Sequence, residues 1–175
     1  SIRRATIASE RTRDLDNVTI VADSFERFEV EKKFDFVTLI GVLEYANVFS
    51  GNENPIKYML DKAISFLKPD GKLILAIENR LGLKYFAGAG EDHIGTPMYG
   101  IEGRYKSTEA VTFGKVELKN HLLASGFKYV DFMAPFPDYK FPSFILTERA
   151  FELSRFDSKI FPALSSRRDA LLPRV

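Results

Sequence analysis

Two side chains in this sequence are placed where they could accept a proton near neutral pH, Glu44 and His93. Glu44 comes shortly after an apolar run at 34–40 that Gly41 stops, and His93 lies in a stretch rich in Gly and Tyr. A positioned carboxylate or imidazole speeds reactions in which a hydroxyl loses its proton, and an imidazole titrates close to neutral pH. Either residue is therefore a candidate general base. The alternative for His93 is an exposed loop histidine with no chemical role.

The second histidine, His121, does not indicate a metal site. His121 falls in a predicted helix among polar residues, and its expected role is structural. Zinc sites combine histidines, cysteines and carboxylates in compact sets, and the chain has no cysteine. The sequence therefore predicts neither a metal site nor a thiolate nucleophile.

Other polar and aromatic side chains could bind a substrate. They are Glu78, Asn79, Arg80, Tyr99, Arg104 and Tyr105. The first three follow an apolar run at 73–77, and the other three fall in an irregular stretch at 81–111. Hydroxyls could bind to the first group, and a sugar or phosphate to the second through stacking and charge-assisted hydrogen bonds. The alternative is that the loop residues only pack the loop.

The elements that must position these residues alternate between strand and helix. Apolar runs predict strands at 18–22, 34–40, 73–77, 127–133 and 141–147. Helical spacing and capping residues predict helices at 2–15, 54–67 and 112–125. The pattern predicts an α/β fold with a partial doubly wound, mostly parallel sheet and an antiparallel edge strand pair. We expect the strand at 34–40 to be buried on both faces and a turn at 68–71.

Length and composition limit the classes of protein to which this chain can belong. The chain has 175 residues and a net charge of +1, which suits one domain and gives no general attraction to nucleic acid. No apolar run approaches the roughly 20 residues that span a bilayer, and no signal peptide is apparent. We expect a cytoplasmic protein with no nucleic-acid partner and no membrane span. The expected domain is 1–148, and 149–175 forms a tail or linker.

Four segments in order, 17–25, 34–45, 63–73 and 122–127, resemble class I S-adenosylmethionine-dependent methyltransferases. They are similar to the family's third strand, its fourth strand and following loop, its Leu-Lys-Pro turn with the fifth strand, and its last helix. The resemblance implies S-adenosylmethionine as the cofactor. It also implies a cofactor-binding set of Asp23, Ser24, Gly41, Val42 and Leu43, with Asp23 near the adenine amino group, and places Glu44 and His93 at the methyl-transfer site.

The chain departs from the family where the cofactor loop should be. Neither the family's glycine-rich loop nor its first two strands is present, and the glycines at 88 and 90 do not lie between a strand and a helix. The chain therefore resembles the C-terminal two-thirds of the domain, and alone we expect it to bind little cofactor. The strand at 18–22 would lack a neighbour, which predicts a homodimer through an exposed edge.

The implied function of the full-length protein is methyl transfer to a small-molecule or glycan-type acceptor. The segments 78–105 and 135–140 look like methyltransferase modules of bacterial surface-polysaccharide (lipopolysaccharide) synthesis, which are often joined to glycosyltransferase domains. One alternative is a non-catalytic, methyltransferase-like interaction module of a glycan-synthesis protein. Another is a nicotinamide oxidoreductase, against which the expected turn at 68–71 and the expected antiparallel end strands both count.

Overall fold

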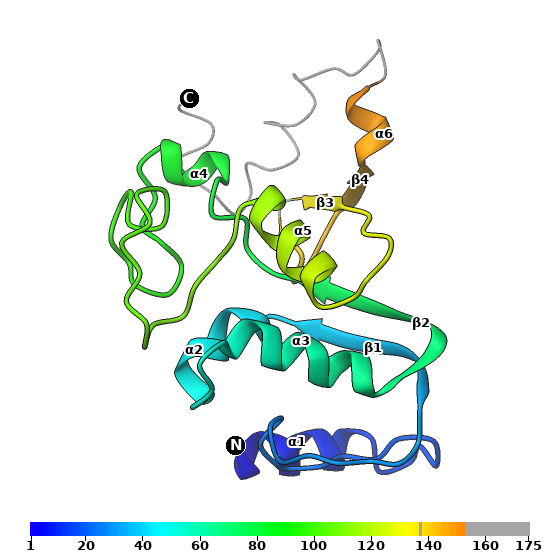
Figure 1. The fold of residues 1–175 in the computed structure, drawn as a ribbon. Helices are drawn as coiled ribbons and strands as arrows, with labels where there is room; N and C mark the ends of the chain where they lie inside the picture. Colours follow the sequence, from blue (N-terminus) through cyan, green and yellow to red (C-terminus); the bar gives the residue numbers. More distant parts are fainter. Residues whose placement is uncertain (137, 153–175) are drawn as a thin grey trace. The chain divides into compact units, whose positions relative to one another are not determined.

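The computed structural model of the chain describes residues 1–136 and 138–152 (Figure 1). The chain divides into two compact units, Ser1–Lys32 and Lys33–Val175. In the first unit, helix α1 spans Ile2–Arg11 and ends at Thr12, whose amide donates to the carbonyls of Ala8 and Ser9. The predicted helix at 2–15 is thus confirmed in a shorter form. The predicted boundary between 148 and 149 stays a prediction.

The predicted strand at 18–22 is wrong. These residues have no strand partner within the described part of the chain, and Val21 is exposed. An isolated extended segment cannot satisfy its backbone hydrogen bonds through a ladder, so β-branched side chains alone do not make a strand here. The homodimer predicted through this edge loses the strand on which it depends.

Two parallel strands form the centre of the second unit. Strand β1 spans Phe34–Ile40 and pairs with β2, Leu67–Ala76. The predicted strand at 34–40 is confirmed, and the one at 73–77 is confirmed as the end of β2. Because parallel strands bring their carboxyl ends to one edge of a sheet, residues that follow Ile40 and Ala76 share that edge.

The turn predicted at 68–71 is wrong, because these residues extend β2 instead. The pairing register shifts there: Phe34 lies opposite Leu67, but Phe36 lies opposite Lys72. The extra residues of β2 bulge out of the ladder, and a Cβ on Gly71 would lie 2.9 Å from the carbonyl oxygen of Phe34. A residue without a side chain allows this close approach.

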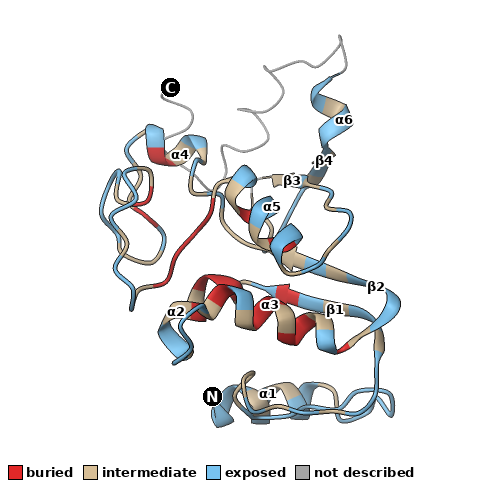
Figure 2. Cartoon of the chain, viewed as in Figure 1, coloured by how far each residue is buried: buried red, intermediate tan, exposed pale blue. Residues whose placement is uncertain are grey.

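Helix α3, Pro55–Ser65, begins as its sequence predicts. The Asn54 side chain accepts a hydrogen bond from the amide of Lys57, and Pro55 occupies the first turn. The helix packs against β2, the short helix α2 (Ala46–Phe49) and α5 (Lys115–Ala124). Its buried face makes up much of the core, as Figure 2 shows. The buried apolar residues of α3 are Ile56, Met59, Leu60 and Ala63.

The expectation that β1 is buried on both faces is wrong. Leu39 is buried, whereas Phe36, which faces the opposite way, is 59% exposed. Ile40 and the neighbouring Ile74 of β2 are also exposed. The apolar run at 34–40 therefore predicts the strand but not how many of its faces are covered.

The long connection at 81–111 is mostly irregular, as predicted, and holds one short helix, α4, Leu83–Phe86. After it, α5 begins at Lys115 with Gly114 as its N-cap, in place of the predicted cap Thr112, whose side chain is fully buried. The amide of Val111 donates to the carbonyl of Glu44, and Asn79 and Phe113 form a parallel bridge. The segment before α5 is thus held between the ends of both parallel strands.

The last two strands pair antiparallel, but they form a sheet of their own and do not extend the β1–β2 sheet. They are β3, Met133–Phe136, and β4, Phe144–Thr147, followed by α6, Glu148–Phe151. The predicted strand at 127–133 is wrong except for its last residue. The pairing register sets the boundary: Met133 lies opposite Thr147, and Phe136 opposite Phe144.

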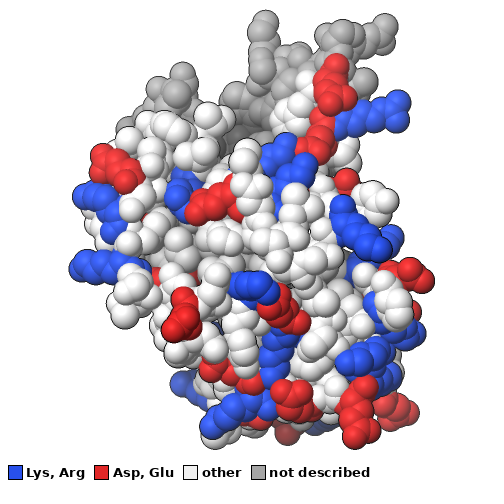
Figure 3. Space-filling view, in the orientation of Figure 1, with Lys and Arg blue, Asp and Glu red and all other residues white. Residues whose placement is uncertain are grey.

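The surface carries charges of both signs. On the face drawn in Figure 3, Lys and Arg lie interspersed with Asp and Glu, without one dominant patch. Among the described residues, no helix is long and apolar enough to cross a membrane.

Candidate functional site

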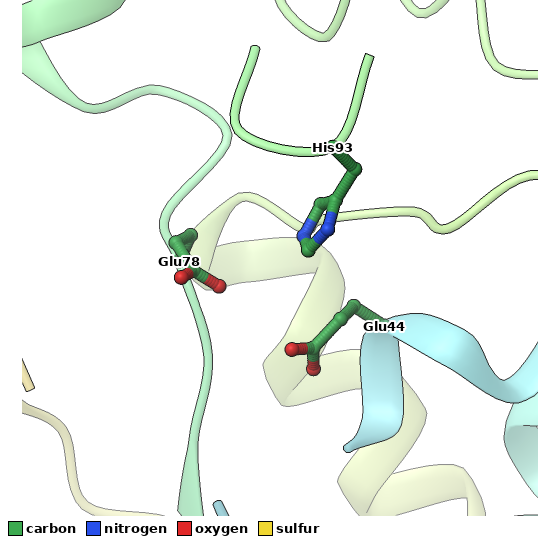
Figure 4. A group of neighbouring side chains, drawn as sticks. All are labelled: Glu44, Glu78 and His93. Atoms are coloured by element: carbon green, nitrogen blue, oxygen red, sulfur yellow. The ribbon is translucent and has the colours of Figure 1, made fainter. Parts of the chain in front are cut away.

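Three acid–base side chains meet at the carboxyl ends of β1 and β2. Figure 4 shows Glu44, Glu78 and His93 pointing toward one another from three separate segments. One ligand atom of each lies within 4.8 Å of the others. Both predicted general bases therefore converge, and Glu78, predicted as a substrate-binding residue, joins them.

Glu44 is held by a single turn that directly follows β1. This turn, η1, spans Leu43–Tyr45, and Glu44 is only 1% exposed. Burial, followed by repulsion from the Glu78 carboxylate, raises the pKa of Glu44 above its ordinary value. The carboxyl group is thereby poised to hold a proton more tightly than an exposed glutamate does.

Glu78 comes just after β2 and is anchored from the β3–β4 connection. Its Oε1 accepts hydrogen bonds from Lys140 Nζ at 2.8 Å and from the Tyr139 hydroxyl at 3.2 Å. The hydrogen bond to Glu78 raises the pKa of Lys140, and burial, followed by the Glu78 charge, raises the pKa of Tyr139 to about 12. Both groups stay protonated at neutral pH, so Glu78 has a fixed positive neighbour.

His93 is positioned by the buried carboxylate of Glu91, two residues earlier in the loop. Glu91 Oε2 accepts hydrogen bonds from the amides of His93, at 2.7 Å, and Ile94, at 2.8 Å. The His93 ring lies edge-on to Tyr45, whose hydroxyl is 3.3 Å from Nδ1. The loop and the turn that carries Glu44 thus hold the imidazole together.

Sequence reasoning missed Glu91, although it is 3% exposed and central to the loop. Its Oε1 accepts a hydrogen bond from the Tyr105 hydroxyl at 3.0 Å, and this hydroxyl also bonds to Thr112 Oγ1. A glutamate in a polar, irregular stretch gives no periodic signal. Only the closing of the chain around it reveals that it supports His93.

Replacing Glu91 with glutamine should lower the free energy of unfolding by about 1–2 kcal/mol, because two backbone amides lose a charged acceptor. Urea denaturation followed by circular dichroism measures the change. The matched control is Glu102→Gln, since Glu102 is half exposed and pairs only with Arg104 at the surface in the contacts described. Equal stability of the two variants would show that Glu91 does not hold the loop.

Each member of the cluster keeps one buried atom without a hydrogen-bond partner. Among the described residues these include Glu44 Oε2, Glu78 Oε2 and His93 Nε2. Buried polar atoms are nearly always paired, because an unpaired one loses its hydration without compensation. Three such atoms in one place can accept a proton from a bound molecule or hold a cation.

The three predicted cofactor-binding residues that follow β1, at 41–43, differ from one another in how far they are buried. Gly41 has a φ of +63°, and a Cβ on it would lie 2.9 Å from the Tyr139 hydroxyl. Val42 is half-buried, but Leu43 lies fully in the core. The Leu43 side chain therefore supports the turn, and any contact that Leu43 makes with a cofactor would come from its backbone.

Asp23 and Ser24 belong to the other unit of the chain. Asp23 Oδ1 accepts a hydrogen bond from the Ser24 amide at 2.7 Å and lies 3.5 Å from Arg27. The carboxylate thus stabilises a local turn. Its predicted contact with an adenine stays a prediction.

The remaining predicted substrate residues mostly contact other parts of the loop. Arg80 donates to the Thr112 carbonyl and to Glu117, and Asn79 accepts from the Leu81 amide. The Tyr99 hydroxyl donates to Glu109, and the Arg104 guanidinium lies over the Tyr99 ring.

Three of these predicted substrate residues, Arg80, Tyr99 and Tyr105, line one small pocket. Their contacts with neighbouring residues are of the kind expected from the alternative that the sequence left open, in which the loop residues only pack the loop.

Comparison with known proteins points to a fold. The chain is similar to a solved S-adenosylmethionine-dependent methyltransferase from Thermotoga maritima, described as a possible histamine N-methyltransferase, with a TM-score of 0.51 and 22% identity. The similarity covers 76% of this chain and 54% of that chain. A putative O-methyltransferase from Nostoc punctiforme has a TM-score of 0.48 and 17% identity, covering 75% of this chain and 38% of its own. No protein-family model matches the chain, and no curated protein matches it either.

The architecture is therefore a partial class I methyltransferase fold, α/β with a parallel strand pair and a separate antiparallel pair. The chain spans about half the length of the Thermotoga protein, 54%. The fold-class prediction is confirmed.

Proposed function

We propose that this chain belongs to an S-adenosylmethionine-dependent methyltransferase and supplies its proton-accepting site. The observation that carries the proposal is the position of Glu44, Glu78 and His93 at the carboxyl ends of β1 and β2. Ligands of doubly wound sheets bind at this edge. The fold shared with the Thermotoga methyltransferase supports the same class of reaction.

The residues after β1 suit the approach of a cofactor. Gly41 has no side chain and a left-handed backbone, so its Cα can be approached closely. We assign Gly41, Val42 and the backbone of Leu43 to the binding of S-adenosylmethionine, which supplies the methyl group as a sulfonium when bound. The role of Asp23 and Ser24 in cofactor binding rests on the sequence resemblance alone. The Tyr139 hydroxyl lies over Gly41 and would have to swing aside.

The cluster handles the proton of the acceptor. A hydroxyl bound beside it can pass its proton to Glu44 Oε2 or His93 Nε2, which have no other partner. A raised pKa brings the Glu44 carboxyl closer to the working pH of a general base. Tyr45 and Glu91 fix the ring of His93, so the proton acceptor is positioned before the substrate arrives.

The proposed acceptor is a small molecule or a glycan-type hydroxyl compound. Asn79 and Arg80 would contact it beside Glu78, and Tyr99, Arg104 and Tyr105 would do so after the loop opens. Support for the glycan class comes from the sequence resemblance of 78–105 and 135–140 to methyltransferase modules of surface-polysaccharide synthesis.

Binding of S-adenosylhomocysteine tests the proposal by calorimetry, on this chain and on the full-length protein. We expect binding by the full-length protein and little by this chain, because the family's glycine-rich loop is absent from this sequence. Binding by neither would favour a non-catalytic interaction module. Tight binding by this chain alone would show that the cofactor is held without that loop.

A transfer assay tests the acceptor and the proton-accepting residues. The full-length protein is incubated with labelled S-adenosylmethionine and either nucleotide sugars or oligosaccharides. We expect transfer to these acceptors and a loss of about 10²–10⁴-fold in the His93→Gln and Glu44→Gln variants, the range typical of a lost general base. The control is His121→Gln, outside the cluster. Transfer only to protein or nucleic acid would reject the glycan acceptor.

A further inference from the structure

The strongest unassigned feature is the set of unpartnered atoms in the cluster. Within residues 1–136 and 138–152, Glu44 Oε2, Glu78 Oε2 and His93 Nε2 are buried without a partner, and the cluster's ligand atoms lie within 4.8 Å of one another. Two carboxylates that face each other in a dry site repel and lose hydration. A positive charge between them removes both costs.

The ammonium group of Lys140 does not supply this positive charge. Lys140 Nζ bonds to Glu78 Oε1, the other oxygen of that carboxylate, and its side chain is 64% exposed. Tyr139 bonds to the same Oε1. These contacts orient Glu78 through Oε1 and leave its Oε2 without a hydrogen-bond partner among the described residues, as outer-shell partners do for metal ligands.

The imidazole of His93 is also oriented by a hydrogen-bonding neighbour. Tyr45 Oη lies 3.3 Å from His93 Nδ1, and a proton on Nδ1 donated to this oxygen leaves a lone pair on Nε2. A neutral imidazole whose other nitrogen is hydrogen-bonded is the usual form of a metal-binding histidine. The loop that carries it is held by Glu91.

We propose that Glu44, Glu78 and His93 bind one divalent transition-metal ion of the Mn²⁺ or Zn²⁺ type through these three atoms. Two oxygens and one nitrogen suit such ions, whereas Ca²⁺ takes six to eight oxygens. Two ligand atoms with bonds of about 2.2 Å lie roughly 3.1–3.6 Å apart in cis or tetrahedral positions, and only a trans pair lies roughly 4.4 Å apart. The three side chains must therefore close toward the ion to complete the site. Three protein ligands leave positions open for a substrate oxygen.

The metal site stands on the geometry and does not require the proposed methyl transfer. If both hold, the ion rather than a proton occupies Glu44 Oε2 and His93 Nε2. A coordinated acceptor hydroxyl would then lose its proton more readily, to solvent, since a bound cation stabilises the alkoxide. The prediction from sequence that the chain has no metal site rested on the spacing of its histidines. The fold supplies the other ligands from positions 15 and 49 residues before His93, in Glu78 and Glu44.

Metal titration of this chain tests the site without cofactor or acceptor. Binding of Mn²⁺ is followed by the loss of the free-ion electron paramagnetic resonance signal, with Zn²⁺ as competitor. We expect one Mn²⁺ per chain and affinity at least about tenfold weaker in each of Glu44→Gln, Glu78→Gln and His93→Gln. The controls are Glu53→Gln and His121→Gln, which change residues outside the cluster and should bind like the original chain.

Circular dichroism and urea unfolding in chelator show that each variant is folded, so weak binding cannot be attributed to misfolding. No saturable binding of Mn²⁺ or Zn²⁺ up to millimolar concentration would overturn the proposal. So would unchanged affinity in any of the three cluster variants, because its side chain would then not be a ligand. Neither result would exclude methyl transfer, which the cofactor-binding and transfer assays measure separately.

Discussion

Replacing Glu44 with glutamine should raise the free energy of unfolding of this chain by about 1–3 kcal/mol at neutral pH in the presence of a chelator, because it removes an unpaired buried charge. Glu44 is fully enclosed, and its Oε2 has no partner. Glutamine has nearly the same shape, and its amide can donate to the free Oε2 of Glu78. The residue proposed to act in chemistry thus lowers stability.

The effect has a defined dependence on pH. Burial, then repulsion from Glu78, raises the folded-state pKa of Glu44 above its unfolded value. Stability from this group is therefore fully present below the unfolded pKa and is lost as pH rises through the folded pKa. The advantage of Glu44→Gln should be small in acid, grow through this window and then level off.

Urea denaturation at a series of pH values, with a chelator in all samples, measures this difference. Glu53→Gln is the matched control, because Glu53 is exposed and the same chemical change there should have little effect. A Glu44→Gln variant less stable than the original chain at neutral pH would show that the carboxylate is satisfied by a favourable contact.

A bound cation should reverse the order of stability. An ion that binds only the folded chain stabilises it in proportion to RT ln(1 + [L]/Kd). Saturating Mn²⁺ should therefore stabilise the original chain and leave Glu44→Gln nearly unchanged. The same carboxylate lowers stability in the free chain and raises it in the metal-bound chain, which links the stability measurement to the proposed ligand role.

The sequence predicted correctly those helices and strands that depend mainly on side-chain types and capping residues close together in the chain. The apolar run at 34–40 and the Asn54–Pro55 start of α3 depend on side-chain type and capping, and the structure confirms both. The strand at 18–22 failed because a strand also needs a neighbour. The turn at 68–71 failed because pairing with β1 absorbs its extra residues as a bulge.

For the site residues too, the sequence predicted what depends on neighbouring residues and missed what depends on distant contacts. Glu44 and Glu78 were found because each follows an apolar run that forms a strand, and their meeting follows from parallel pairing of β1 with β2. The supports of the site could not be read from the sequence. Glu91, Tyr139 and Lys140 reach the cluster through irregular segments, where no periodicity indicates which side chains turn inward.

Replacing Leu60 with alanine should lower the free energy of unfolding by about 2–5 kcal/mol, the range for deleting a large buried side chain and leaving a cavity. Leu60 is 0% exposed and lies on the inner face of α3. That helix packs against β2 and α2, and α2 continues directly from the turn that carries Glu44. The core under α3 therefore holds the strand ends that present the cluster.

Urea unfolding measures the loss, and Leu123→Ala is the control because Leu123, on α5, is 43% exposed. A loss below about 1 kcal/mol would place Leu60 outside the main core, since surface substitutions usually fall within that range. A fully folded Leu60→Ala chain should also bind Mn²⁺ more weakly, because a cavity beside α3 loosens the turn that fixes Glu44. Unchanged metal affinity with reduced stability would mean that backbone hydrogen bonds such as that from Val111 to Glu44 keep the geometry of η1 without the core under α3.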